Sequence, residues 1–128
     1  MTVLYLDASA LVKLAIAEPG ADELTALVNE ASEIVTSAVA LVELRRALAR
    51  SAPEFDPDII IERCTVIDLD PTIIRQAGIL PPPTLRSLDA IHVASALAVA
   101  SDLDAFVTFD ERQAAAAAAA GLPVEIFA

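Results

Sequence analysis

Short apolar runs alternate with longer helical segments along the whole chain, and this alternation restricts the possible folds more than any other feature. The strand-like runs are residues 3–6, 34–36, 65–69, 105–109 and 123–127, the last of them at an edge. Apolar strands that alternate with helices pair in parallel and are covered on both faces. The chain is therefore predicted to be an α/β protein, a three-layer α/β/α sandwich around a mainly parallel sheet of four to five strands with right-handed crossovers.

Capping residues and helix breakers place the expected helices between these strands. Serine or aspartate opens most of the helices, and proline or glycine ends several of them. The expected segments are a helix capped by Ser9 and running to about Glu18, a helix over 21–31, one from Ser37 to about Arg50, short ones opened by Asp56-Pro57 and Asp70-Pro71, one from Ser87 to about Ala100, and one from Asp110 to Gly121. Three consecutive prolines make 79–86 a loop.

Length and composition fit one domain and exclude several classes of protein. The chain has 128 residues, 56% hydrophobic and 21% charged, which excludes intrinsic disorder and fits a single domain over 1–128. The 19 acidic and 8 basic side chains give a net charge of −11, which excludes a nucleic-acid binder of the usual basic kind. The chain opens without a signal-peptide pattern and contains no run of about 20 apolar residues, so we expect a cytoplasmic protein that makes no membrane contact. A lone cysteine, Cys64, cannot form a disulfide within the chain.

Four acidic residues stand where folds of this class bind their ligands. Asp7 directly follows the first strand-like run and Asp110 ends the fourth, while Glu43 and Asp89 lie in the opening turns of helices. Parallel sheets bind ligands beyond the carboxyl ends of their strands, where the strand order reverses. All four side chains are therefore expected to project from the same end of the sheet.

Carboxylates that converge on one place favour a bound cation. At about 5 Å and an effective dielectric constant of about 20, one pair of carboxylates repels by about 3 kcal/mol. A hard divalent cation, Mg²⁺ or Mn²⁺, removes that cost because it prefers oxygen ligands and bridges carboxylates to phosphate. Such an ion also activates water and stabilises charge on a phosphodiester. The four acids thus indicate metal-assisted hydrolysis of a phosphate ester.

Each acid also has a purely structural interpretation. Asp110 with Gln113 matches a helix capping box, and Asp89 near the start of its helix suits the helix dipole. Glu43 is spaced for an ion pair on a solvated helix face. Asp7 is the hardest to explain in this way, since an unpaired carboxylate between two apolar segments is costly to bury.

Four short blocks carry the four acids in order along the chain. They are 5–14 (YLDASALVKL), Thr36-Ser37 with 42–47 (VELRRA), 88–97 (LDAIHVASAL) and 107–112 (VTFDER). In this order and at this spacing they resemble PIN-domain ribonucleases, particularly the VapC-type toxins of bacterial toxin–antitoxin pairs. The resemblance covers essentially the whole chain. It implies a PIN-like α/β/α sandwich whose acidic pocket binds Mg²⁺ or Mn²⁺ and cleaves single-stranded or loop RNA.

The resemblance also implies a role for each acid. By position in the blocks, Asp7 and Asp89 would be the principal metal ligands. Glu43 and Asp110 would complete the pocket, bind the metal directly or through water, and orient the attacking water.

Further site residues and partners follow from the same resemblance. Ser9 and Thr108 would hydrogen-bond carboxylates or phosphate, with a helix cap and an ordinary strand residue as the alternatives. The family resemblance implies a homodimer and a cognate antitoxin, whose C-terminal tail would cover the groove and present an arginine to the carboxylates.

Most of the basic residues lie close in sequence to an acid block. Those expected to contact RNA or the antitoxin are Lys13, Arg46, Arg50, Arg86 and Arg112. Local positive potential together with a metal could hold an RNA backbone despite the acidic total. Ordinary helix-surface charges are the alternative.

Two other functions remain open at this point. One is a catalytically inactive PIN-like scaffold that only binds a partner or RNA. The other is a phosphatase with Asp7 as nucleophile. Such an enzyme requires a second acid two residues after the nucleophile, where this chain has Ser9. His92, one helical turn after Asp89, has two interpretations, contact with the site and the favoured one of a packed helix histidine, and Cys64 is expected to be a small core residue.

Overall fold

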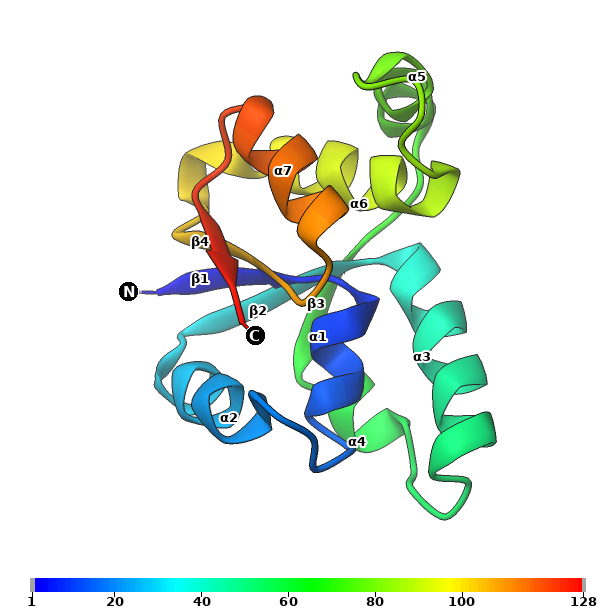
Figure 1. The fold of residues 1–128 in the computed structure, drawn as a ribbon, viewed down its shortest axis with the longest axis vertical. Helices are drawn as coiled ribbons and strands as arrows, with labels where there is room; N and C mark the ends of the chain where they lie inside the picture. Colours follow the sequence, from blue (N-terminus) through cyan, green and yellow to red (C-terminus); the bar gives the residue numbers. More distant parts are fainter. Residues whose placement is uncertain (1, 128) are drawn as a thin grey trace.

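Five parallel strands form the central sheet of the computed structural model, which describes residues 2–127 (Figure 1). The strands are β1 (Val3–Leu6), β2 (Glu33–Ser37), β3 (Cys64–Ile67), β4 (Ala105–Thr108) and β5 (Val124–Ile126). They lie in the order β3-β2-β1-β4-β5, and every neighbouring pair is parallel. The predicted α/β fold is confirmed, and β5 lies at an edge as expected.

The strand order reverses beside β1, the central strand. The chain adds β2 and then β3 on one side of β1, and afterwards crosses over to add β4 and β5 on the other side. The register pairs Leu6 with Val107, so the residues that follow β1 and β4 emerge next to each other. The Asp7 N–H donates to the carbonyl oxygen of Val107 at 3.3 Å, which holds the two strand ends together.

Helices cover both faces of the sheet (Figure 1). One layer contains α1 (Ala8–Lys13), α2 (Ala21–Glu30), α3 (Ala38–Ser51) and α4 (Asp58–Ile61), which share a core with one face of the strands. The other layer contains α6 (Ser87–Leu97) and α7 (Glu111–Ala119), and α5 (Pro71–Ile79) packs against α6. Side chains of β1 point alternately to the two faces of the sheet, so Leu4 and Leu6 pack in the first core and Tyr5 packs in the second.

The first helix begins and ends earlier than predicted. Asp7 rather than Ser9 is its N-cap, since the Asp7 carboxylate accepts the N–H of Ala10 at 2.9 Å. The helix ends at Lys13 and does not reach Glu18, because the N–H groups of Leu14 and Ala15 bond to carbonyls three residues back and tighten the chain out of the α conformation.

α6 begins at Ser87, as predicted, and Arg86 occupies its N-cap position without a side-chain cap. One further helix start differs from the prediction. Pro57 is the N-cap of α4 and not its first residue, and the Asp56 carboxylate accepts the N–H of Asp58 at 3.0 Å. The caps predicted at Ser37, Asp70 and Asp110 are confirmed.

Two element ends also differ. β3 spans Cys64–Ile67 instead of 65–69, because the chain turns there and the Asp70 N–H bonds to the Asp68 carbonyl at 3.1 Å. α6 ends at Leu97, and a short 3₁₀ helix, Ala100–Asp102, replaces its predicted last turn. The proline segment forms the predicted loop between α5 and α6. Within residues 2–127 no helix is both long and apolar enough to cross a membrane.

Candidate active site

A cleft of about 360 Å³ opens where the strand order reverses, and all four predicted acids line it. Asp7 follows β1 directly and Asp110 follows β4 after one residue. Glu43 comes from the middle of α3, and Asp89 comes from the first turn of α6. Four segments that are far apart in the sequence therefore bring their carboxylates to one cleft.

Asp7 is the most buried of these acids, with 2% of the residue exposed. Its Oδ1 accepts hydrogen bonds from Ser9 Oγ at 2.7 Å and from the Ala10 N–H at 2.9 Å, and its Oδ2 accepts one from Thr108 Oγ1. Burial raises the pKa of the Asp7 carboxyl above its ordinary value, and the hydrogen bonds from Ser9 and Thr108 offset part of that rise. The structure thus places both predicted hydroxyl residues on the Asp7 carboxylate.

The same two hydroxyls tie the loop after β4 to the start of α1. Ser9 Oγ accepts the N–H of Phe109 at 3.0 Å, and Thr108 Oγ1 accepts the N–H of Asp110 at 3.0 Å. Each hydroxyl therefore donates to Asp7 while it accepts from the backbone on the opposite side of the cleft floor. This arrangement fixes the position of Asp7 relative to Asp110.

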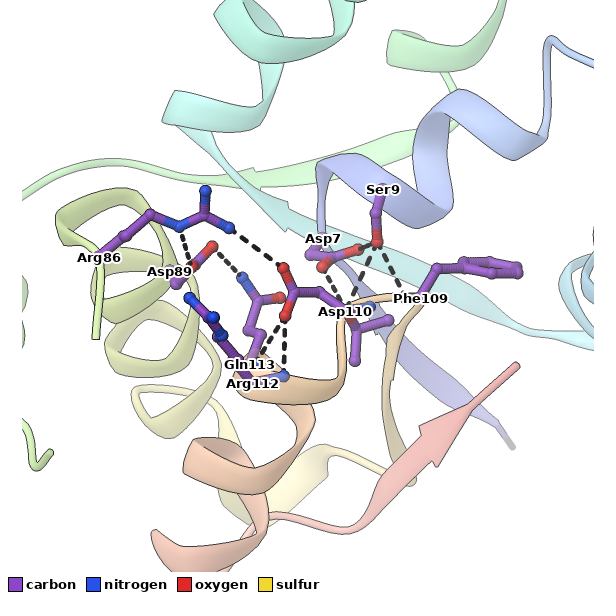
Figure 2. A network of polar contacts seen from close by, with 9 residues as sticks. Asp7, Ser9, Arg86, Asp89, Phe109, Asp110, Arg112 and Gln113 are labelled. Carbon is purple, nitrogen blue, oxygen red and sulfur yellow. Dashed lines mark hydrogen bonds and ion pairs between the residues drawn. The ribbon is translucent and has the colours of Figure 1, made fainter. Parts of the chain in front are cut away.

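Arg86 bridges the other two aspartates at the mouth of the cleft (Figure 2). Its Nε lies 3.3 Å from Asp89 Oδ2, and its Nη2 lies 3.4 Å from Asp110 Oδ2. The Arg86 side chain is 70% exposed, whereas those of Asp89 and Asp110 are 15% and 30% exposed. An exposed cation at the rim thus pairs with two carboxylates that are more buried.

Backbone and amide groups hold the remaining oxygens of these aspartates. Asp110 Oδ1 caps α7 by accepting the N–H groups of Arg112 and Gln113 at 2.9 and 3.1 Å. Asp89 Oδ1 accepts Gln113 Nε2 at 2.9 Å. The cap predicted at Asp110 is therefore confirmed, but the capping box is not completed, because the Gln113 side chain donates to Asp89 instead of bonding back to Asp110. The cap is compatible with a place in the cleft because only one of the two Asp110 oxygens caps the helix.

The Glu43 carboxylate contacts a histidine that belongs to the core and also lines the cleft. Glu43 Oε1 lies 2.7 Å from His92 Nε2, and His92 Nδ1 lies 2.7 Å from the Tyr5 hydroxyl. His92 is buried, as predicted for a packed helix residue, but it also lines the cleft. Packing within the helix and contact with the site, the two interpretations open for His92, therefore both hold.

The donor set suits a hard divalent cation, although the side chains do not form a closed cage as they stand. In the part of the chain that the structure describes, no group of three or more His, Cys, Asp or Glu side chains is arranged to hold a metal ion. Arg86 occupies two carboxylates, and His92 engages one oxygen of Glu43. Because Arg86 is largely exposed, its two ion pairs are worth at most about 1 kcal/mol each, and its departure would leave carboxylate oxygens of the kind that Mg²⁺ and Mn²⁺ prefer.

A second hollow of about 330 Å³ continues from the cleft between α1 and α3. It shares Ser9 and Glu43 with the cleft and is bordered by Arg46 and Arg50. Of the five basic residues expected to contact RNA or an antitoxin, Arg46, Arg50 and Arg86 therefore border the cleft or this groove.

The other two predicted contact residues lie elsewhere. Lys13 pairs with Glu18 at 3.5 Å and lies 5.0 Å over the Phe109 ring, in a separate hollow. Arg112 lines another hollow, beside the proline loop. Sequence proximity to an acid block is thus a poor guide to position here, because neighbouring helical residues face different sides.

Sequence reasoning missed three residues that hold the acids. Tyr5 was assigned only to a strand, Gln113 only to a capping box, and His92 to packing. No local spacing indicated these side-chain contacts, because Gln113 donates to Asp89, 24 residues away, and His92 contacts Glu43, 49 residues away. Tyr5 acts through His92, which is 87 residues away.

Residues 4–119 match the family model described as PIN domain. The chain belongs to the PIN-domain family. Among curated relatives of this PIN domain, "Ribonuclease VapC35" of Mycobacterium tuberculosis (strain ATCC 25618 / H37Rv) is 40% identical over 128 residues, which cover 95% of each chain. The resemblance to VapC-type PIN ribonucleases is confirmed.

Solved structures share the PIN fold at lower identity. VapBC2 from Rickettsia felis, crystallised with a DNA fragment from its promoter, has a TM-score of 0.69 at 18% identity and covers 99% of this chain and 100% of that chain. VapC20 of Mycobacterium tuberculosis, a sarcin-ricin loop cleaving toxin, has a TM-score of 0.69 at 18% identity and covers 93% and 95%. These two similarities support the architecture, and the more similar relatives support the subfamily.

Proposed function

We propose that this protein is a metal-dependent endoribonuclease, the toxin of a VapBC-type pair. The observation that carries the proposal is that four carboxylates from four separate segments line one cleft at the reversal of strand order. A chain with that cleft is 40% identical to a protein named Ribonuclease VapC35. Repelling carboxylates gathered at a ligand-binding position are costly unless a cation and an anionic substrate use them.

Asp7 and Asp89 would be the principal ligands of Mg²⁺ or Mn²⁺. Glu43 and Asp110 would bind it directly or through water. When bound, the ion would lower the pKa of an attacking water and stabilise the charge that develops on the phosphodiester. The donor set fits this role because it consists of hard carboxylate oxygens, and within residues 2–127 Arg86 is the only highly exposed basic side chain paired with them.

The side chains of the protein would perform the remaining steps. Ser9 and Thr108 donate hydrogen bonds to the Asp7 carboxylate, so that it would need no reorganisation to act as a metal ligand. Glu43 uses Oε1 for His92, and among residues 2–127 its Oε2 shows no hydrogen-bond partner, so Oε2 would accept a proton from the attacking water. Arg86 would move from the carboxylates to a phosphate oxygen of the RNA.

The RNA would enter along the groove that continues from the cleft. Arg46 and Arg50 lie one helical turn apart on α3 and border this groove, so they are placed to contact successive phosphates of a single strand. The net charge of −11 opposes any extended nucleic-acid surface. We therefore expect weak, metal-dependent binding of single-stranded or loop RNA.

An antitoxin and a second copy of the chain complete the proposal. VapBC2 supports the antitoxin, since that relative in fold was crystallised as a VapBC assembly. An antitoxin that presents an arginine would compete with Arg86 for the same carboxylates. The homodimer rests on the family resemblance, and exposed apolar residues on α5, Ile74 and Ile79, are available to such an interface.

A phosphatase that uses Asp7 as nucleophile has less support. Both oxygens of Asp7 accept hydrogen bonds, and the residue is nearly inaccessible. In-line attack on phosphorus needs an open line of approach to the carboxylate oxygen, whereas a small cation in the cleft can share an oxygen that also accepts a hydrogen bond.

Cleavage of a structured RNA tests the proposal. Purified protein should cleave the RNA with Mg²⁺ or Mn²⁺ and lose the activity with chelator, and Asp7→Asn should reduce the rate by at least about 100-fold because it removes a charged ligand. Asp68→Asn, an exposed aspartate outside the cleft, is the matched control and should cleave like the wild type. Chelator-resistant cleavage, or an Asp7→Asn variant as active as the control, would contradict the proposal.

A further inference from the structure

A buried pair, Tyr5 and His92, connects the core of the protein to Glu43. The Tyr5 hydroxyl and the Glu43 carboxylate each lie 2.7 Å from a different ring nitrogen of His92. We infer that His92, anchored by Tyr5, is the positioning residue for Glu43 in RNA hydrolysis. The inference rests on the proposed function. It adds His92, which is neither one of the four acids nor one of the arginines of the groove.

The chemistry of the three groups fixes the direction of the hydrogen bonds. A carboxylate only accepts, so His92 Nε2 carries the proton and donates it to Glu43 Oε1. In the neutral ring Nδ1 then has a free lone pair, which accepts the Tyr5 hydroxyl proton. In the protonated ring Nε2 still donates to Glu43. The bond to Glu43 therefore survives in either protonation state of His92.

Packing makes His92 a rigid anchor. Tyr5 is 0% and His92 1% exposed. The Tyr5 ring stacks on Phe106 with centroids 5.1 Å apart and planes at 5°, and it meets the His92 ring edge-on at 5.9 Å. Tyr5, itself stacked on Phe106, thus packs against the buried imidazole and holds it in place.

Glu43 needs such an anchor because its own helix does not supply one. Its side chain is 28% exposed and has three rotatable bonds. Arg46, three residues further along α3, offers a competing cation on the groove side. With Oε1 held by His92, Oε2 is left in a fixed position for the attacking water. Without that bond, the carboxylate would sample several rotamers.

Three substitutions separate positioning from packing. Glutamine places an N–H near the position of Nε2, asparagine places one near the position of Nδ1, and leucine fills the space without a donor. We expect His92→Asn and His92→Leu to lower kcat by about 10- to 100-fold, the usual effect of losing a group that orients a ligand. His92→Gln should stay within about threefold of the wild type, and KM for RNA should change little in all three. Asp68→Asn serves again as the matched control.

Nuclear magnetic resonance of the metal-free protein supplies a readout besides activity. With ¹⁵N-labelled histidine, of which the chain has one, the Nε2 proton should be visible and slow to exchange in the wild type. It should exchange much faster in Glu43→Ala, which removes the acceptor. Equal protection in both proteins, or an unprotonated Nε2 in the wild type, would overturn the inference even if the His92 variants failed to fold.

The outcomes separate this inference from the function on which it rests. A wild type that does not cleave RNA would overturn the proposed function, and with it the role of His92 in hydrolysis. An active wild type whose His92→Asn variant folds and cleaves equally well would overturn the positioning role alone. If kcat of the three variants followed their melting temperatures instead of the donor pattern, His92 would be a packing residue only.

Discussion

Replacing Arg86 with alanine should strengthen metal binding while it weakens the binding of RNA. The Arg86 guanidinium lies 3.3 and 3.4 Å from oxygens of Asp89 and Asp110, which the metal would also use. In the proposed cycle this arginine is first a competitor of the metal and then a phosphate contact. The two effects of its removal therefore have opposite signs in two separate measurements.

The size of the effect follows from the geometry. A divalent ion bound to the same carboxylates would lie on the order of 5 Å from the guanidinium. Because the Arg86 side chain is 70% exposed, the dielectric constant of water, about 80, is appropriate, and the repulsion is then about 1.7 kcal/mol. Salt screens part of it, so we expect Kd for Mn²⁺ to fall by about tenfold. The free energy of unfolding should change by no more than about 1 kcal/mol, since exposed ion pairs contribute little.

Isothermal titration calorimetry at low ionic strength measures this change. Arg86→Lys keeps the charge and should resemble the wild type, and Arg75→Ala removes an exposed arginine from α5 as the matched control. In the cleavage assay, Arg86→Ala should raise KM for RNA. If Arg86→Ala binds Mn²⁺ as weakly as the wild type or more weakly, Arg86 does not compete with the metal, and the reasoning is refuted.

Three further predictions follow from the buried groups. Burial raises the pKa of Asp7, so the folded state retains a proton that the unfolded chain loses near pH 3.8. The resulting contribution to the free energy of unfolding is complete below that pH and is lost as the pH rises through the raised pKa. In denaturant titrations without metal, the free energy of unfolding of Asp7→Asn should therefore decline less with pH than that of the wild type. Millimolar Mg²⁺ should raise the melting temperature of the wild type but not that of Asp7→Asn, because only the folded cleft binds the ion; equal shifts in both would place the ion elsewhere. Tyr5→Phe leaves His92 Nδ1 buried without a donor and should lower the free energy of unfolding by about 1–3 kcal/mol in urea titrations, whereas an unchanged value would mean that the hydroxyl contributes nothing.

The layered fold could be predicted because strand and helix periodicities differ and the strands are short. Alternation placed all five strands, and the Asp70 and Asp110 caps marked two helix starts correctly. The start of α1 was missed because Asp7 and Ser9 are both good capping residues. Sequence does not show which of them the backbone N–H of Ala10 will reach.

The gathering of the acids could be predicted from the rule for parallel sheets, whereas their partners could not. Asp7, Glu43, Asp89 and Asp110 all reach one cleft because the strand ends converge there. The link from Glu43 to His92 spans 49 residues, and its formation depends on how α3 and α6 lie relative to each other. Tertiary packing sets that geometry, and no local spacing in the chain encodes it.

Diffraction from a crystal soaked in Mn²⁺ tests the central claim most directly. Anomalous density should appear in the cleft, in contact with carboxylate oxygens of Asp7 and Asp89, and the Arg86 side chain should have turned away from Asp89 and Asp110. An Asp7→Asn crystal soaked in the same way should lack the peak. If crystals of protein that cleaves RNA show no manganese at these carboxylates, or show it only outside the cleft, the four acids are not the metal centre of this protein.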